Sequence, residues 1–153
     1  MKDQKAILNI ARKTIDSEAA AIENLSSLID ADFAETVSCI LQSEGRVVIS
    51  GIGKSAIIAS KIVATMNSTG TPAIFMHAAD AIHGDLGTIQ KNDVVICISK
   101  SGNTPEIKML VPLIQRGTNT LIGMTGNMDS FLAEKANFVL NTFVEKEACP
   151  NNL

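Results

Sequence analysis

The chain contains no tryptophan and no tyrosine, and aromatic residues make up only 3% of its 153 residues. It therefore lacks the aromatic platforms on which single-stranded bases stack. Its 13 basic and 16 acidic residues give a formal charge of -3, and neither sign forms a long run that would follow a nucleic-acid backbone. We expect no binding to DNA or RNA.

Cysteine is scarce as well. Cys39, Cys97 and Cys149 lie far apart, and no Cys-x-x-Cys pair indicates a disulfide framework, a redox motif or a zinc site. Cys97 stands in an apolar run and is expected in the core. No apolar run approaches the length of a membrane span, and the first residues mix both charges. The sequence thus predicts a soluble, cytoplasmic protein without a metal or membrane association.

A hydrophobic content of 46% over 153 residues is sufficient for one buried core, so we expect a single domain. Runs rich in branched residues predict buried strands at residues 47–49, 73–76, 94–98, 121–124 and 138–140. Helices are expected between them, at residues 54–67, 79–82, 104–116 and 130–136. Continuous apolar strands joined by helical crossovers predict a doubly wound α/β fold, with a five-stranded, mostly parallel sheet of the flavodoxin or Rossmann kind.

Two further helices are predicted ahead of this α/β core, within about residues 3–43. Apolar residues recur every three or four positions from Leu8 to Ile29, which indicates one long amphipathic helix. A second helix, at about 32–43, is expected to bury the apolar side chains of Phe33, Val37, Ile40 and Leu41. Gly45 is then expected to end that helix in a left-handed conformation.

The first predicted strand leads into the glycine-rich turn Gly51-Ile52-Gly53-Lys54-Ser55, in which a helix begins with a cation and a hydroxyl. A nucleoside triphosphate loop would need glycine at position 48, where the chain has Val48. The Gly51-x-Gly53-x-x-Ala56 spacing fits a relaxed dinucleotide fingerprint, but the next acidic residue after the second strand lies 24 positions beyond Ala56. Three interpretations of this turn therefore stay open: an anion site, a dinucleotide (NAD) site to which the match is weak, and an ordinary tight turn.

A second turn follows the most apolar strand and contains Ser99, Ser101 and Thr104 within six residues. Hydroxyls and free N–H groups at a helix start bind phosphate, and Pro105 is accommodated in the first helical turn. The alternative is simple N-capping by Thr104 with Glu106 in the first turn, which leaves Ser99 and Ser101 unexplained.

Two more segments follow strands and carry titratable side chains. The first holds both histidines of the chain; His83 precedes Gly84 and Asp85, whereas His77 at a strand end is interpreted as structural. The second is Glu145-Lys146-Glu147-Ala148-Cys149-Pro150, which follows the last strand.

Taken together, these segments resemble the SIS (sugar isomerase) domain of the arabinose-5-phosphate isomerase family in order and in spacing. The matching segments are Gly51 to Ser55, Asn67 to Pro72, His83 to Gly87, Ser99 to Glu106 and Lys146 to Pro150. The resemblance implies an aldose–ketose isomerase that needs no cofactor and interconverts ribulose 5-phosphate and arabinose 5-phosphate through an enediol. The pathway stays open between lipopolysaccharide, capsule and sugar-alcohol metabolism.

The same resemblance implies a role for each matching residue. The substrate and its phosphate are expected at Gly53, Ser55, Ser99, Ser101, Gly102, Asn103 and Thr104. The catalytic candidates are Lys54 as an electrostatic stabiliser, Glu106 and Glu147 as bases, and His83 as a proton shuttle or ring-opening group. A homodimer or homotetramer is implied as well.

Relatives continue beyond the Cys-Pro segment with a further helix, a later histidine and often paired CBS modules. This chain ends at Leu153, so its α/β core, about 46–153, is expected to lack the closing helix and any CBS domain. A binding-only regulatory SIS domain is therefore the alternative to an isomerase.

Overall fold

The structure, a computed structural model, describes residues 3–149. Its centre is a five-stranded sheet in which every pairing is parallel, in the order β2-β1-β3-β4-β5. The strands are β1 (Val47–Gly51), β2 (Ala73–His77), β3 (Val94–Ile98), β4 (Thr120–Thr125) and β5 (Phe138–Asn141). The prediction of five strands is confirmed.

Helices cover both faces of this sheet, as the uninterrupted apolar strands predicted. The helices of the α/β core are α3 (Lys54–Ser68), α4 (Ala78–Ala81), α5 (Pro105–Gln115) and α6 (Phe131–Lys135), with a short 3-10 turn, η2, at Asp85–Thr88. One hydrophobic cluster joins the sheet to α4, α5 and α6, and a second joins it to α3 and α2. Cys97 is fully buried in the first cluster, as expected.

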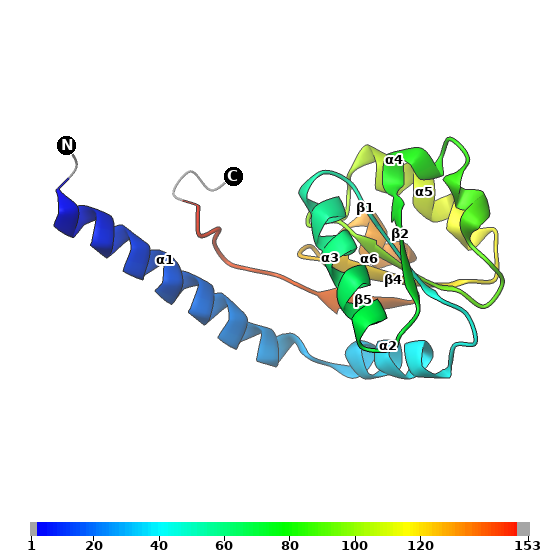
Figure 1. Cartoon of the computed structure of the whole chain (residues 1–153), viewed down its shortest axis with the longest axis horizontal. Helices are drawn as coiled ribbons and strands as arrows, with labels where there is room; N and C mark the ends of the chain where they lie inside the picture. Colours follow the sequence, from blue (N-terminus) through cyan, green and yellow to red (C-terminus); the bar gives the residue numbers. More distant parts are fainter. Residues whose placement is uncertain (1–2, 150–153) are drawn as a thin grey trace.

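The N-terminal helix α1 (Gln4–Leu25) ends before Ile29 and is followed by a 3-10 turn, η1 (Ser26–Leu28). It extends away from the α/β body as a separate arm (Figure 1). None of its residues is buried, and its largest exposed apolar side chains are Ile7, Leu8, Ile10, Ile15 and Ile22. Across residues 3–149, no helix has the length and apolar character needed to cross a membrane.

The helix α2 (Ala31–Gln42) packs against β5, where Asp32 accepts a hydrogen bond from Val139 N at 2.8 Å. The predicted burial of its apolar face is wrong for three of four residues. Phe33 is 43% exposed, Val37 40% and Leu41 78%, whereas Ile40 packs against the core. Thr36 is the residue of α2 that is buried. The amphipathic pattern indicates that one face of α2 is covered by another part of the protein. It does not show which side of the helix packs against β5.

Gly45 is not the predicted left-handed terminator. The glycines with positive φ are Gly53, Gly70, Gly84 and Gly102. At Gly45 the requirement is space, because an added Cβ would lie 2.4 Å from the carbonyl of Asn92. Asn92 itself has a φ of 80°, in the left-handed region that asparagine tolerates.

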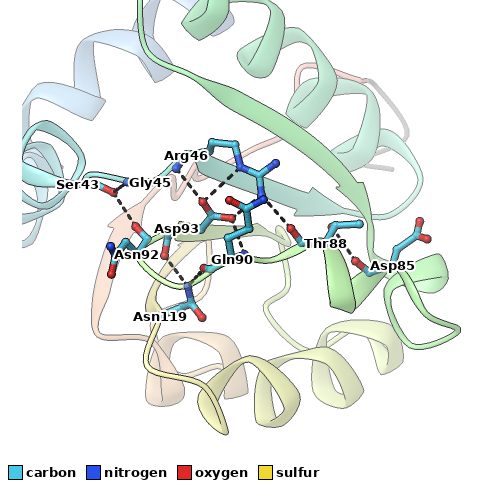
Figure 2. A network of polar contacts seen from close by, with 9 residues as sticks. All are labelled: Ser43, Gly45, Arg46, Asp85, Thr88, Gln90, Asn92, Asp93 and Asn119. Carbon is cyan, nitrogen blue, oxygen red and sulfur yellow. Dashed lines mark hydrogen bonds and ion pairs between the residues drawn. The ribbon is translucent and has the colours of Figure 1, made fainter.

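The amino-terminal ends of the central strands are joined by a polar network around the buried carboxylate of Asp93 (Figure 2). The Asp93 carboxylate accepts hydrogen bonds from Arg46 N, Arg46 Nη2 and Gln90 N, each at 2.8 Å. Asn119 Nδ2 donates to Gln90 O and Asp93 O. Burial disfavours ionisation of Asp93, but hydrogen bonds from Arg46 and the Gln90 amide outweigh it and hold the pKa of Asp93 below its usual range. This network braces β1, β3 and β4 at one edge of the sheet.

Candidate functional site

The opposite edge, at the carboxyl ends of the strands, contains a cavity of about 520 Å³. Loops that follow β1, β3, β4 and β5 form its wall, as expected for ligand sites in open α/β sheets. The lining residues are Ile52, Ser55, Ile98, Ser99, Lys100, Ser101, Thr104, Gly126, Asn127, Phe143 and Val144. Four predicted binding residues, Ser55, Ser99, Ser101 and Thr104, are therefore brought together.

The loop of residues 99–104, which the sequence predicts to bind phosphate and which we therefore call the phosphate loop, makes a tight turn centred on Gly102, whose φ is 64°. Gly102 N donates to Ser99 O at 3.0 Å, and Asn103 N donates to Ser101 Oγ at 3.2 Å. Ser99 Oγ and Thr104 Oγ1 lie 3.5 Å apart. The three hydroxyls thus lie on one short segment, an arrangement that suits an anion such as phosphate.

This loop leads directly into α5. Thr104 is the N-cap residue, but its side chain makes no capping hydrogen bond, so the simple N-capping interpretation is wrong. Pro105 occupies the first turn as predicted. The start of this 11-residue helix therefore offers N–H groups and a partial positive charge to an anion in the cavity.

The turn after β1 forms the adjacent wall. Gly53 has a φ of 59° and is the N-cap of α3, without a side-chain capping bond. Gly51 approaches Ser55 so closely that an added Cβ would lie 3.0 Å from its backbone. Ser55 lines the cavity, and Lys54 beside it is exposed at the helix start. The turn thus brings the Ser55 hydroxyl into the cavity wall, whereas Lys54 is not among the described residues that line it.

The two candidate catalytic carboxylates, Glu106 and Glu147, are not among the described residues that line the cavity. Glu106 is half-buried in the first turn of α5. Glu147 forms an ion pair with Lys100, which belongs to the phosphate loop and lines the cavity. The segment after β5 is thereby tied to this loop by opposite charges.

The structure does not bring the histidines into the cavity wall formed by the described residues. His83 is exposed after α4, and its backbone N–H donates to Asp80 O at 2.9 Å. His77 lies at the end of β2, with Nδ1 3.7 Å from Asp80 Oδ2. The structural role of His77 and the proton-shuttle role of His83 stay predictions.

Sequence reasoning missed part of the cavity wall. Lys100, Asn127 and Phe143 line it. Thr125 lies behind this wall, where its Oγ1 donates a hydrogen bond to Lys100 O at 3.1 Å. A signal for two of these was available, because Thr125 and Asn127 follow a predicted strand at its carboxyl end.

Two observations limit the chemistry of this edge. Burial raises the pKa of the Cys97 thiol to about 12, so it is no thiolate nucleophile at neutral pH. Among residues 3–149, no cluster of three or more histidine, cysteine or acidic side chains could hold a metal ion.

The parallel sheet, the glycine turn and the hydroxyl loop define an α/β domain of the doubly wound class with a cavity at the carboxyl edge of its sheet. Residues 40–152 match the SIS domain, and the chain belongs to this family.

Comparison with known proteins agrees with this assignment. The chain is 46% identical over 153 residues to arabinose 5-phosphate isomerase KdsD of Pseudomonas aeruginosa, covering all of the chain and 47% of the relative. It is 44% identical over 149 residues to arabinose 5-phosphate isomerase GutQ of Escherichia coli K12, covering 97% of the chain and 46% of the relative. The chain thus spans less than half the length of these curated relatives.

Two solved structures share most of their length with the chain. One, a protein of E. coli CFT073 in complex with arabinose 5-phosphate, has a TM-score of 0.93 and 36% identity, over 99% of this chain and 80% of that one. The other, described as a sugar-phosphate isomerase of Listeria monocytogenes, has a TM-score of 0.95 and 38% identity, over 100% and 81%.

Proposed function

We propose that this chain is the sugar-phosphate isomerase domain of an arabinose 5-phosphate isomerase, which interconverts ribulose 5-phosphate and arabinose 5-phosphate. The observation that carries the proposal is the phosphate loop at the wall of the 520 Å³ cavity. This volume lies in the range of ordinary small-molecule sites. The names of the curated relatives, and the arabinose 5-phosphate complex of one structural neighbour, support the choice of sugar and favour an enzyme over a binding-only domain.

The phosphate would bind to the hydroxyls of Ser99, Ser101 and Thr104 and to N–H groups at the start of α5. The sugar would then extend along the wall formed by Ile52 and Ser55, toward Lys54 at the start of α3. Phosphate binding at one end holds the reacting carbons in place.

The reaction moves one proton between C1 and C2 of the sugar, through an enediol, so no electrons are exchanged with a cofactor. A carboxylate removes the proton, and Glu106 and Glu147 are the candidates. The Lys54 cation would stabilise the negative charge that develops on the enediol oxygen. His83 would serve as a proton shuttle or in ring opening.

We further expect a homodimer or homotetramer in the cytoplasm. The exposed apolar face of α1 supports self-association, because a helix with no buried residue gains little from the rest of its own chain. Sedimentation or light scattering on the purified protein tests this expectation. A monomer at micromolar concentration would contradict it.

The experiment that tests the function is an assay for arabinose 5-phosphate formed from ribulose 5-phosphate. The proposal predicts turnover without added cofactor, in this chain or in a longer version of the protein. Binding without turnover in both would instead support a regulatory domain, and would appear as a rise in melting temperature with the sugar phosphate alone. The absence of both binding and turnover would refute the proposal.

A further inference from the structure

The last residue of β4, Thr125, is fully buried beneath the phosphate loop. Its hydroxyl donates to Lys100 O at 3.1 Å and accepts from Asn127 N at 3.2 Å. Gly126 N donates to the same Lys100 carbonyl at 3.0 Å. Two donors from the β4–α6 connection therefore fix the orientation of one peptide group in the phosphate loop.

A second set of bonds ties the loop to the start of α6. Leu132 N donates to Gly102 O at 3.0 Å. Asn103 Oδ1 accepts from Phe131 N at 3.3 Å, and Asn103 Nδ2 donates to Ser101 O at 3.2 Å. Asn103 was predicted to bind the phosphate, but both ends of its side chain are engaged by backbone groups.

Three backbone carbonyls of the loop, those of Lys100, Ser101 and Gly102, accept hydrogen bonds among these contacts. In a trans peptide the N–H points opposite to the C=O, so directing Lys100 O toward Thr125 turns the N–H of Ser101 the other way. Ser101 lines the cavity, whereas Thr125 and Asn103 are not among the described residues that line it. Residues 125–132 thus hold the carbonyl oxygens of Lys100 and Gly102, which would repel a phosphate, in hydrogen bonds of their own.

The space behind the loop is filled as well. A Cβ added at Gly102 would lie 2.0 Å from Ser130 Oγ and 3.0 Å from Thr125 Oγ1. The loop therefore rests against this connection in van der Waals contact, and small displacements of either segment would be transmitted to the other.

We propose that Thr125 and Asn103 are positioning residues that hold the phosphate loop in its anion-binding conformation without touching the phosphate. The inference rests on the proposed function, because it assumes that the cavity binds a sugar phosphate. It assigns to Thr125 and Asn103 a role in affinity that acts through the loop and not through contact with the phosphate.

The main test is Thr125→Val in the full chain, which keeps the shape of the side chain and removes the hydroxyl. Affinities for inorganic phosphate and for arabinose 5-phosphate are measured by titration calorimetry. We expect both to fall about tenfold, the loss typical of one or two hydrogen bonds. Thr125→Ser, which keeps the hydroxyl, should restore affinity to within about threefold of the original.

Thr36→Val is the matched control. Thr36 is also a buried threonine, but its hydroxyl has no partner among the described residues and lies in α2. Its replacement should leave both affinities unchanged. Equal losses in Thr36→Val and Thr125→Val would mean a general effect of the substitution and would overturn the inference.

Asn103→Ala keeps the test decisive if Thr125→Val does not fold, since Asn103 is exposed. We expect about threefold to tenfold weaker phosphate binding, a higher KM and a kcat within about twofold. Unchanged affinity in the folded variants would refute the positioning role alone. If the unsubstituted protein bound neither phosphate nor arabinose 5-phosphate, the proposed function would fail first, and this inference with it.

Discussion

The two edges of the sheet differ in how completely their buried polar groups are paired. At the amino-terminal edge, the Asp93 carboxylate receives three hydrogen bonds of 2.8 Å, and Asn119 holds two carbonyls beside it. At the carboxyl edge, Ser50 Oγ and His77 Nδ1 are buried without a hydrogen-bond partner in the described part of the chain. The first edge is complete by itself, whereas the second has unused bonding capacity.

The amino-terminal edge therefore contributes to stability, whereas the carboxyl edge carries the candidate site. A buried polar group without a partner costs free energy, and, apart from Thr36 in α2, the described groups of this kind lie at the carboxyl edge. The cavity and the phosphate loop occur at the edge that carries this cost. The following changes test whether the two edges are as distinct as the contacts indicate.

The largest effect is expected from the candidate bases at the carboxyl edge. Glu106→Gln and Glu147→Gln should each lower kcat, because an amide cannot remove the sugar proton; the loss for the true base is about 100-fold or more. Steady-state kinetics with ribulose 5-phosphate measure this. Glu134→Gln, on the exposed face of α6, is the control and should have full activity. If neither Gln variant loses activity, the assignment of the base is wrong.

Gly102→Ala should abolish phosphate binding and destabilise the fold by about 3 kcal/mol, through a left-handed residue combined with overlap against Ser130. Gly70→Ala is the matched control, since Gly70 also has positive φ, 95°, but an added Cβ meets nothing within 4 Å. It should cost only about 1–2 kcal/mol. Chemical unfolding and phosphate titration measure both. Equal losses of stability would show that crowding behind the loop is unimportant.

Asp93→Asn breaks the amino-terminal edge and should lower the free energy of unfolding by about 2–3 kcal/mol without changing phosphate affinity. Asp16→Asn on the exposed α1 should do neither. If Asp93→Asn lowered the phosphate affinity as much as Thr125→Val does, the two edges would not be functionally distinct.

The pKa of Asp93 adds a dependence on pH to this prediction. Because the folded-state pKa lies below the ordinary value of 3.8, the stabilisation is present above that value and is lost as the pH falls through the lower, folded-state pKa. Unfolding of the original protein should therefore become easier below about pH 4, more steeply than that of Asp93→Asn. Parallel acid dependence in the two proteins would contradict the role of the carboxylate.

The smallest effect is expected at Ser50. Removing its unpaired hydroxyl in Ser50→Ala should change the free energy of unfolding by less than about 1 kcal/mol, or raise it. Ser130→Ala provides the contrast, because the Ser130 side chain caps α6 by accepting from Ala133 N. That change should cost about 1 kcal/mol. A larger loss at Ser50 would show that its hydroxyl has a partner in solution.

The sequence was sufficient for the strands and for much of the site. Buried parallel strands carry continuous apolar runs, such as 94–98, and the hydroxyl loop and glycine turn are local patterns. It was not sufficient for Phe33 and Leu41, because an amphipathic pattern does not specify which neighbour covers the face. Gly45 was misread because its close approach to Asn92 joins segments 47 residues apart.

The site shows the same limit. A side-chain amide such as that of Asn103 can face a ligand or a backbone group, and local sequence does not distinguish them. The Lys100–Glu147 ion pair and the contact of Thr125 with the loop depend on how the ends of β3, β4 and β5 meet. Such long-range pairs follow from strand order, which the sequence left open.

The central claim is that the ligand binds at the carboxyl edge alone. Its most direct test is the change in backbone amide NMR shifts when arabinose 5-phosphate is added to the isotope-labelled protein. We predict saturable shifts in residues 51–55 and 99–106, with the amides around Arg46, Asp93 and Asn119 unchanged. Shifts centred on the amino-terminal network, or none at millimolar ligand, would contradict the account.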